Sequence, residues 1–371
     1  MKTGKEDGAV YGREQPGQLS VISFTENGKR LSRVIKETMG HMEVTLYTKH
    51  GSSQGQECEI QPLPVETSVG MWAKTQMEQG SAMVFIGACG IAVRAVAPYI
   101  TDKLHDCPVL VMDELGKYVI SVLAGHMGGA NQLACQLAEK TGAQPVITTA
   151  TDLNGKFAVD LFAKRNRLFI EDSRGIGSVS ARALEGKLIT LSVETGHWRG
   201  KDPTPEGVCL LDYGSGETAD VVVTSRSGEF GGALLLRPKE YVIGMGCRKG
   251  KDAGQIEAFI LREIEKLGIS VEQISGLASI SQKSREEGMV AWCRKERVPF
   301  IIFDAKELGE MEGEFCGSAF VEKTVGVDNV CERAALKACG PGGKLVWKKQ
   351  SENGMTIAVA KREWMVDFYG E

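Results

Sequence analysis

Residues 121–152 read SVLAGHMGGANQLACQLAEKTGAQPVITTATD, and this stretch decides the fold. It carries the end of an apolar strand, a glycine-rich loop, a helical pattern over residues 131–140, and a second strand, PVITTA, over residues 145–150. A strand, a helix and a second strand in succession are typical of an α/β sheet with parallel pairs. In such sheets ligands bind beyond the carboxyl ends of the strands. We therefore look for functional residues in the segments that follow strands.

The same alternation extends toward the amino terminus. Strand and helix patterns follow one another over residues 19–24, 29–40, 42–48, 82–86, 91–100, 108–113 and 118–123. We predict an N-terminal α/β domain with a parallel sheet over residues 18–152. The charged, glycine-rich segment before it, residues 1–17, is expected to be a flexible extension.

The character of the chain changes after residue 152. Residues 153–238 contain two helical patterns and then short strands separated by glycine-rich turns, which predicts a smaller, strand-rich middle domain. The α/β rhythm resumes over residues 239–371, so we predict a C-terminal α/β domain. Its last hairpin has Asn353 and Gly354 at the tip, a pair typical of tight hairpin turns.

Composition excludes several classes of function. The 371 residues carry a formal net charge of -4 with no basic stripe, so we expect no nucleic-acid partner. No apolar run approaches the roughly 20 residues of a membrane span, which predicts a cytoplasmic protein without a membrane partner. The ten cysteines and five histidines lack metal-ligand spacing, so we expect reduced thiols and no protein-bound metal.

The glycine-rich loop holds the first candidate residues. His126 lies beside Gly128 and Gly129, and Asn131 begins or caps the following helix. The free N–H groups at that helix start could bind an anion or oxyanion, and His126 could transfer protons near neutral pH. The alternative is a tight glycine turn in which His126 is structural.

Polar residues also follow the next strand. Thr148, Thr149 and Asp152 come at the end of PVITTA, where the same sheet edge is expected. We predict that this segment and the glycine loop lie on one wall of a site, within about 10 Å of each other. The alternative for Asp152 is that it caps the next helix.

Two further clusters could bind carboxylates or line a site. Gly90, Arg94 and Lys103 follow the strand over 82–86, and both cations could clamp a carboxylate, although solvated surface charges are the alternative. In the C-terminal part, Cys247 lies in the turn GMGCRKG, residues 244–250. That turn resembles a dinucleotide fingerprint only weakly, because its third glycine is one residue late. An activated thiol and an inert, packed one are both open for Cys247.

Several long motifs resemble the cobalamin biosynthesis protein CbiG family. They are FIGACGIAVRAVAP (85–98), residues 111–134, PVITTATD (145–152), YVIGMGCRKG (241–250), LASISQKSREEGM (277–289), residues 318–336 and TIAVAK (356–361). The last four include Lys283, Glu286 and Glu332. The similarity runs from about residue 19 to residue 361, and the middle segment resembles the family only loosely.

This resemblance implies a cobalt-precorrin-5A hydrolase of anaerobic vitamin B12 biosynthesis. Such an enzyme opens the δ-lactone of a cobalt corrinoid and releases the C-20 carbon as acetaldehyde. Cobalt would arrive inside the substrate, so no separate cofactor is implied. His126, with Asp152 beside it in the expected site, would supply the base, and the N–H groups of Gly128 and Gly129 would stabilise the oxyanion.

The remaining candidates would bind the substrate. Its many carboxylates suit Arg94, Lys103 and the helix start, and we expect Cys247, Lys283 and Glu332 to form a second face of a cleft between domains. Alternatives are a corrinoid escort protein without turnover, a nucleotide-binding enzyme that uses GMGCRKG and, less favoured, a metal-dependent hydrolase. A homodimer and transient contacts with neighbouring pathway enzymes also stay open.

Overall fold

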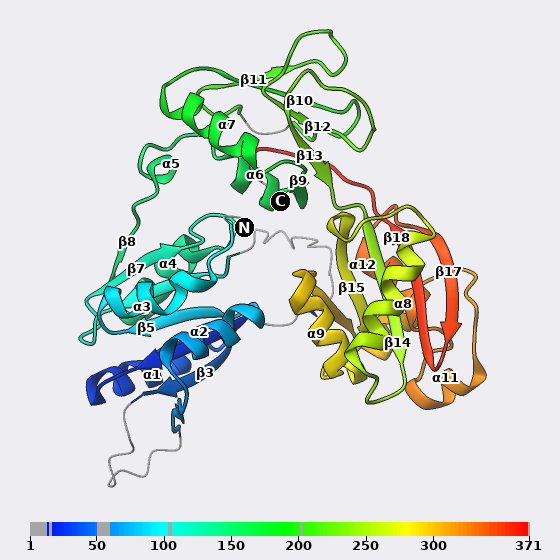
Figure 1. Ribbon diagram of the computed structural model, residues 1–371. Helices are drawn as coiled ribbons and strands as arrows, with labels where there is room; N and C mark the ends of the chain where they lie inside the picture. The colour runs from blue at the N-terminus through cyan, green and yellow to red at the C-terminus, as the bar shows by residue number, and fades with distance from the viewer. Residues whose placement is uncertain (1–12, 15–16, 50–59, 103–105, 201–202, 370–371) are drawn as a thin grey trace, which may run out of the picture.

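In the computed structural model the chain forms three structural units, each built around one β-sheet with its own apolar core (Figure 1). The structure describes residues 13–14, 17–49, 60–102, 106–200 and 203–369. The middle unit lies above the other two in Figure 1, and the C-terminus lies beside it. None of the helices formed by these residues has the length and apolar character needed to cross a membrane.

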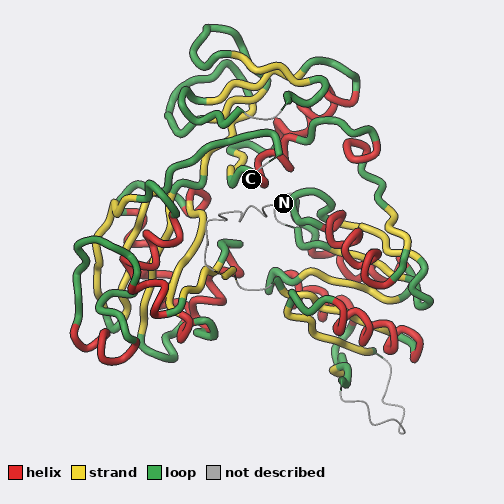
Figure 2. Tube along the Cα trace, turned by 180° about the vertical axis from the view of Figure 1, so that it is seen from behind, coloured by secondary structure: helices red, strands yellow, loops and turns green. Residues whose placement is uncertain are grey.

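The N-terminal unit is a seven-stranded sheet in the order β4-β3-β2-β5-β6-β7-β8. Helices α1 and α4 cover one face, where they bury Ile35 and Leu133, and α2 and α3 cover the other, where they bury Trp72 and Ala92 (Figure 2). Its elements are β2 (Gln18–Ser23), α1 (Glu26–Thr38), β3 (Glu43–Thr48), β4 (Leu63–Pro64), α2 (Val69–Glu78), β5 (Ala82–Ile86), α3 (Cys89–Val96), η1 (Ala97–Tyr99), β6 (Val109–Met112), β7 (Tyr118–Leu123), α4 (Ala130–Thr141) and β8 (Gln144–Val146).

One strand reversal changes the geometry of this sheet. β6 and β7 are antiparallel, with Val109 opposite Leu123, whereas the other neighbours in the sheet pair in parallel. The carboxyl ends of β7 and β8 therefore lie at the amino ends of β5 and β6. The segment after β5 and the loop after β7 consequently begin at opposite ends of the strands, separated by the length of a five-residue strand, about 17 Å.

The middle unit is a five-stranded, mostly parallel sheet in the order β11-β10-β12-β13-β9. The sequence therefore predicted its strand content. Its elements are α5 (Ala150–Leu153), α6 (Val159–Arg165), β9 (Leu168–Ile170), α7 (Arg174–Leu184), β10 (Ile189–Val193), β11 (Val208–Leu211), β12 (Val221–Val223) and β13 (Leu234–Pro238).

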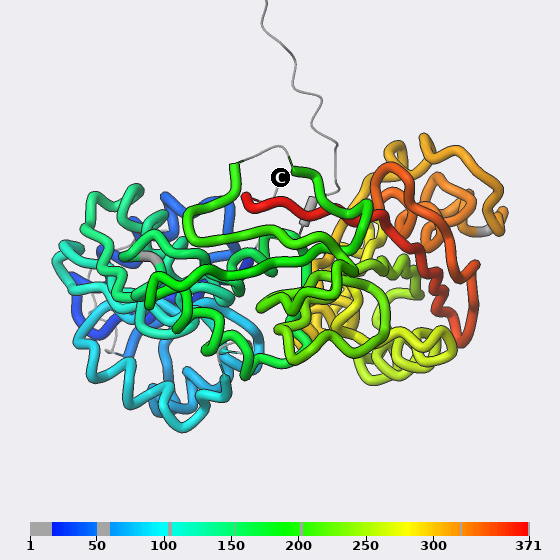
Figure 3. The backbone as a smooth tube through the Cα atoms, turned by 90° about the horizontal axis from the view of Figure 1, so that it is seen from above, coloured from blue at the N-terminus to red at the C-terminus, as the bar shows by residue number. Residues whose placement is uncertain are grey.

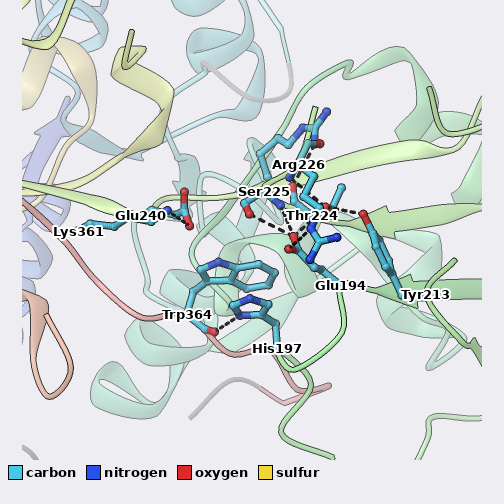
Figure 4. Close-up of polar contacts among 10 residues, drawn as sticks. Glu194, His197, Tyr213, Thr224, Ser225, Arg226, Glu240, Lys361 and Trp364 are labelled. Atoms are coloured by element: carbon cyan, nitrogen blue, oxygen red, sulfur yellow. Dashed lines mark hydrogen bonds and ion pairs between the residues drawn. The ribbon is translucent and has the colours of Figure 1, made fainter. Parts of the chain in front are cut away.

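A buried carboxylate closes the carboxyl end of β10 and β12 in this unit (Figure 4). Glu194 is 5% exposed and accepts hydrogen bonds from Thr224 Oγ1 (2.8 Å), Ser225 N (2.8 Å) and Arg226 Nε (2.8 Å). Burial alone would raise the pKa of Glu194, but these donors hold it below its ordinary value. The carboxyl ends of these two parallel strands, where such sheets commonly bind ligands, are thus linked by hydrogen bonds to Glu194.

The end of the chain returns to the middle unit, which residue order alone did not indicate. Trp364, Val366 and Phe368 belong to its core, and Asn166 exchanges hydrogen bonds with the backbone of Asp367. The ring of His197 stacks on Trp364 with centroids 3.7 Å apart (Figure 4). Figure 3 shows this final red segment running back along the green middle unit.

The C-terminal unit is a six-stranded sheet in the order β1-β16-β15-β14-β18-β17, covered by α8 and α9 on one face and by α10 and α12 on the other. Its β1 comes from the segment before residue 17, for which a flexible extension was expected. The elements are β1 (Arg13–Glu14), β14 (Tyr241–Cys247), α8 (Ala253–Glu265), η2 (Val271–Gln273), β15 (Ile274–Ile280), η3 (Ser281–Lys283), α9 (Glu287–Glu296), β16 (Phe300–Phe303), α10 (Ala305–Gly309), α11 (Ala319–Val325), α12 (Cys331–Cys339), β17 (Lys344–Glu352) and β18 (Met355–Lys361).

Removal of the Trp364 ring should destabilise the middle unit. Trp364 is 4% exposed, so Trp364→Ala is expected to lower the free energy of unfolding by about 3–5 kcal/mol. Urea unfolding followed by circular dichroism would measure this loss. Leu115→Ala, at a position that is 65% exposed, is the control and should change stability by no more than about 0.5 kcal/mol. Equal stability of the two variants would contradict a core role for the returning segment.

Candidate functional site

The glycine loop folds back on itself before α4. Ala124 has a φ of 56° and Gly129 a φ of 87°, both in the left-handed region. This geometry lets Ala130 N and Asn131 N donate to the carbonyls of Ala124 and Gly125, at 3.1 and 3.0 Å. Gly129 N donates to the carbonyl of His126, at 3.0 Å. These N–H groups are therefore engaged within the loop, and the expectation that they face a ligand does not fit the structure.

Gly128 has a packing explanation as well. A Cβ on Gly128 would lie 2.4 Å from the Cβ of Ala124 and 2.8 Å from its carbonyl oxygen. The residue must be glycine for the loop to close, whether or not a ligand approaches. A side chain at Gly128 would thus disturb folding first, and the sequence-based assignment of Gly128 as an oxyanion donor stays a prediction.

His126 connects the N-terminal unit to the middle unit. Its Nδ1 lies 3.1 Å from Asp160 Oδ2 on α6, and its Nε2 lies 3.4 Å from Thr151 Oγ1 on α5. The His126 side chain is 10% exposed and that of Asp160 is 16% exposed. A carboxylate at one ring nitrogen fixes the orientation of an imidazole and favours a proton on that nitrogen.

The charges around His126 come from one face of α6. Burial alone would raise the pKa of Asp160, but the hydrogen bond and charge of His126 outweigh it and hold that pKa below its ordinary value. Burial lowers the pKa of Lys164, and the nearby charge of Asp160 partly opposes this. Lys164 Nζ lies 3.2 Å from the point where a Cβ on Gly129 would stand, so it lies beside the start of α4.

The predicted proximity of the glycine loop and the strand end is confirmed. Asn131 Nδ2 donates to Thr149 Oγ1 at 3.0 Å, and Thr151 reaches His126 as described above. Thr148 is exposed next to them. Asp152 is the third residue of α5 and therefore does not cap that helix. We call this group the seam cluster and define it as His126, Asn131, Thr149, Thr151, Asp160 and Lys164.

The predicted carboxylate clamps lie apart from the seam cluster or outside the described residues. Gly90 and the exposed Arg94 follow β5, at the opposite edge of the sheet. The Arg94 guanidinium folds back over Gly90, since a Cβ there would lie 3.3 Å from Arg94 Nη1. Lys103 lies outside the described residues. The antiparallel pairing of β6 and β7 is the physical reason for this separation.

A large cavity lies within the C-terminal unit, at the carboxyl ends of β14 and β15. Its volume is about 1570 Å³, and its lining residues all fall within 246–356. Six of these residues are basic: Arg248, Lys249, Lys251, Lys283, Arg285 and Lys349. Cys247 also lines it, and burial raises the pKa of its thiol to about 11. A thiol with such a pKa is protonated at neutral pH, which fits the inert alternative.

Glu286 already occupies one carboxylate position on the wall of this cavity. Its carboxylate accepts from Gly250 N at 2.6 Å and Lys251 N at 3.2 Å, and it pairs with Lys283 Nζ at 2.8 Å. Burial alone would raise the pKa of Glu286, but Lys283 and the two N–H groups keep it below its ordinary value. The wall is thus built to hold a carboxylate.

Glu332 was predicted to lie on a face of the substrate cleft, but the structure buries it away from the cavity. It is fully buried and accepts from Cys316 N (2.8 Å), Asn329 Nδ2 (2.6 Å) and Lys349 N (2.7 Å). A carboxylate held in this way cannot contact a ligand in the cavity. Glu332 instead fixes the backbone at Lys349, one of the cavity residues.

The C-terminal cavity and the seam cluster do not form one cleft. Residues at the start of α9, including Glu287, line the cavity. Near the other end of α9, Arg294 Nη2 lies 3.7 Å from Glu43 Oε2 of the N-terminal unit. Gly288 and Ala291 of the same helix also line the cavity, so it extends to within one helical turn of Arg294, but its lining residues in the described part of the chain all fall within 246–356 and include none of the N-terminal or middle unit. The expected second face of a shared cleft is not formed in this arrangement.

Two of the three glycines of GMGCRKG, Gly244 and Gly246, are explained by packing, and the third, Gly250, has a left-handed φ of 76°. A Cβ on Gly244 would lie 1.8 Å from the carbonyl oxygen of Cys331, and one on Gly246 would lie 2.9 Å from Thr356 Oγ1. Gly244 therefore permits α12 to lie directly on β14. This close contact accounts for the partial resemblance to a nucleotide-binding fingerprint, and that alternative is not favoured.

Fold and site together define a three-part α/β protein with an oriented histidine at the boundary of two units and a cavity with a basic rim in the third. The family descriptions "Cobalamin synthesis G N-terminal" and "Cobalamin synthesis G C-terminus" match residues 71–152 and 241–360. The chain belongs to the CbiG family.

Relatives of known name resemble the chain over most of its length. It is 32% identical to a cobalt-precorrin-5A hydrolase of Priestia megaterium, over 96% of this chain and 98% of the relative. It is 33% identical to the enzyme of the same name from Salmonella typhimurium, over 80% and 86%. A solved cobalamin biosynthesis protein G homolog from Sulfolobus solfataricus is 21% identical, covers 93% of this chain and 97% of its own, and has a TM-score of 0.38.

Sequence reasoning missed Asp160 and Lys164. They are four residues apart on an amphipathic helix whose other face buries Val159, Phe162 and Ala163. That spacing is ordinary for a solvated ion pair, so the pattern alone did not distinguish them. Only the docking of α6 against the glycine loop gives them their place.

The Asp160 carboxylate should contribute pH-dependent stability. A carboxyl group with a depressed folded-state pKa stabilises the fold above its unfolded pKa of about 3.9, and this contribution is lost as the pH falls through the lower folded-state value. Asp160→Asn should therefore cost about 1.5–3 kcal/mol at pH 7, and progressively less as the pH is lowered below about 4. Urea unfolding across this pH range measures the difference, with the exposed Asp212→Asn as control. A difference between wild type and Asp160→Asn that stayed constant down to pH 2 would contradict the assignment.

Proposed function

We propose that this protein is a cobalt-precorrin-5A hydrolase. Two relatives of that name match most of the chain, and family matches cover both the N-terminal and C-terminal units. The observation that carries the chemical part of the proposal is the contact of His126 Nδ1 with Asp160 Oδ2 at 3.1 Å. It provides an oriented imidazole, the side chain best suited to proton transfer near neutral pH.

In the proposed reaction, His126 acts through Nε2. The imidazole removes a proton from water as the oxygen attacks the lactone carbonyl, and Asp160 stabilises the imidazolium that forms. The Lys164 ammonium supports the developing oxyanion, together with the N–H group of Gly128. When the ring C–O bond breaks, the imidazolium returns its proton to the leaving oxygen. The hydroxyl group then gives its proton to the neutral His126 as the carbon–carbon bond to the macrocycle breaks, so that this carbon leaves with its methyl group as acetaldehyde and the bonding electron pair stays on the macrocycle, which His126 then protonates.

The other residues have supporting parts in this proposal. Asn131 and Thr149 hold the strand end against the loop, and Thr151 places a hydroxyl at His126 Nε2. Asp152 follows Thr151 directly, and its catalytic role stays a prediction. Arg94 and Lys103 remain candidates for binding substrate carboxylates, and Arg94 lies at the opposite end of the strands from the seam cluster.

Other properties follow from the proposed substrate. Cobalt enters as part of the corrinoid, so the reaction as written needs no resident cofactor. The partner is a small anionic macrocycle in the cytoplasm, with no nucleic acid or membrane. A homodimer and contact with neighbouring enzymes of the same pathway remain open.

Acetaldehyde release separates this proposal from an escort protein. An escort would bind the corrinoid without turnover, whereas the hydrolase releases acetaldehyde in proportion to substrate consumed. Anaerobic incubation with cobalt-precorrin-5A, with a trapping reagent for the aldehyde, measures this directly. Tight binding without any aldehyde would leave the escort alternative.

The role of His126 can be tested by His126→Gln. The side chain links two units and is mostly buried, so glutamine, which retains hydrogen-bonding groups, is preferable to alanine. The rate of acetaldehyde release per folded molecule should fall by roughly 10²- to 10⁴-fold, since the variant has no base near neutral pH. His41→Gln, at an exposed position, is the control and should keep the wild-type rate. A near-wild-type rate in folded His126→Gln would show that His126 is only structural.

Asp160→Asn should also change the reaction, through His126. Loss of the carboxylate weakens the stabilisation of the imidazolium, so the acidic limb of the pH–rate profile should move to lower pH while the rate on the plateau falls. A role of Asp160 in holding α6 in place alone would lower the fraction of folded protein without moving that limb.

A further inference from the structure

A small cavity lies between the middle and C-terminal units, and we call it the junction pocket. Its volume is about 280 Å³, near the lower limit of about 300 Å³ for usual small-molecule sites. It is lined by residues 165–167 at the end of α6, by the end of α12 and by residues within the returning segment 362–367. Its lining residues in the described part of the chain include none of the seam cluster and none that line the larger cavity. The proposed reaction therefore does not use it.

Four arginines line the junction pocket: Arg165, Arg167, Arg199 and Arg362. They come from three segments far apart in the sequence, which are the end of α6, the loop after β10 and the returning segment. A guanidinium binds phosphate or carboxylate oxygens through paired N–H groups in a planar fork, whereas a lysine acts as a point charge. Four guanidinium groups around one small pocket indicate a site for an oxyanion.

The junction pocket stays positively charged when its negative groups are counted. Glu363 and Asp367 line it, and the carboxyl ends of α6 and α12 each add about half a negative charge. Burial raises the pKa of the Cys339 thiol to about 12, so this lining residue is neutral near neutral pH. The four guanidinium groups thus exceed the negative groups by about one charge, which an anionic ligand would balance.

Contacts of the returning segment hold the pocket in place. Asp367 N donates to Asn166 Oδ1 at 3.0 Å, and Asn166 Nδ2 donates to the carbonyl of Asp367 at 2.8 Å. Both residues are buried. Arg167 follows directly and has a φ of 53°, in the left-handed region that residues other than glycine rarely adopt. Arg167 therefore stands on backbone that the docking of the returning segment fixes.

The arrangement favours a phosphate group over a carboxylate. A carboxylate has two oxygens in one plane, which one or two guanidinium forks satisfy, whereas a phosphate group has at least three free oxygens that point in different directions. Arginines from three segments suit the second geometry. Arg167, Arg199 and Arg362 already interact with other groups of the chain, but each guanidinium has five N–H donors, so a ligand can be bound in addition.

We propose that the junction pocket binds a phosphate group, either as free phosphate or as part of a small phosphate ester. The phosphate would connect the end of α6 to the returning segment and so strengthen their docking. This site does not depend on the proposed reaction, since it uses neither His126 nor the corrinoid. The alternative is that the arginines only balance the two carboxylates and the helix ends, which predicts no phosphate binding.

Saturable phosphate binding to the full-length protein is the test. Calorimetric titration with inorganic phosphate at constant ionic strength should reach saturation, and the Tm should rise with phosphate concentration. Acetate under the same conditions should bind about tenfold or more weakly. The double variant Arg165→Gln/Arg199→Gln, at two exposed positions, should weaken phosphate binding by about tenfold or more, because two charge-assisted contacts are lost.

The matched control is Arg30→Gln/Lys36→Gln on α1, at two exposed positions. It changes the net charge by the same amount and should keep the phosphate affinity within about twofold. Absence of saturation in the wild type, unchanged affinity in Arg165→Gln/Arg199→Gln, or an equal loss in the control would overturn the junction pocket as the site. Equal affinity for acetate would overturn phosphate as the class of ligand.

A phosphate ester distinguishes the two sources of the ligand. If glycerol 3-phosphate binds about tenfold or more tightly than inorganic phosphate, the ligand is an ester, and equal or weaker binding identifies free phosphate. His126→Gln should bind phosphate as the wild type does while it releases less acetaldehyde. Phosphate binding by a wild-type protein that releases no acetaldehyde would contradict the proposed function and support the junction pocket, and acetaldehyde release without phosphate binding would do the reverse.

Discussion

The antiparallel pairing of β6 with β7 is the constraint on which the site depends. It turns the carboxyl end of β7 to the amino edge of the neighbouring strands, so the glycine loop emerges where α5 and α6 of the middle unit approach. Had β7 been parallel to β6, the loop would share an edge with Arg94. The cause is local: only residues 113–117 join the two strands, and a connection that short cannot make a parallel crossover, which needs a dozen residues or more.

That reversal makes the seam cluster depend on how two units dock. His126 belongs to one unit and Asp160 to the other, so their contact forms only when α6 lies against the loop. The middle unit is in turn tied to the C-terminal unit twice, through the chain at residues 238–241 and through the returning segment that buries Trp364 and Phe368. Two connections restrict rotation between these units more than one connection does. The position of α6 therefore depends on the last residues of the chain, far from His126 in sequence.

Much of the fold could be predicted from the sequence, because it is set by local patterns. The strand and helix periodicities give the elements of the first and last units, and Asn353 (φ 48°) and Gly354 (φ 74°) adopt the left-handed conformations that their hairpin turn requires. The contact of the glycine loop with the strand end follows from β7 and β8 being parallel neighbours. The short turn before β7 also indicates the reversal, since five residues cannot form a parallel crossover, and the reversal places Arg94 at the other end of the strands from the glycine loop.

Other features could not be predicted because they arise from contacts between distant segments. Asp160 and Lys164 look like a solvated pair until α6 docks, and nothing in residues 364–368 indicates the core that they join. The glycines of the two loops suggested ligand binding, and this interpretation was misleading for a related reason. Gly128 and Gly244 are required where backbone meets backbone within the fold, and the same residue type is used where a ligand meets backbone.

Electrostatics argues for different behaviour at the two sites. At the seam cluster the charges are desolvated and few, so their interactions depend on geometry and respond little to salt. In the C-terminal cavity Lys283 and Glu286 neutralise each other, and the remaining positive charge comes from Arg248, Lys249 and other rim residues that water reaches. Attraction of any anion to that rim is long-ranged and weakens with ionic strength. The two sites therefore differ in how strongly their interactions depend on salt, because the charges of the seam cluster are mostly buried and those of the cavity rim are exposed.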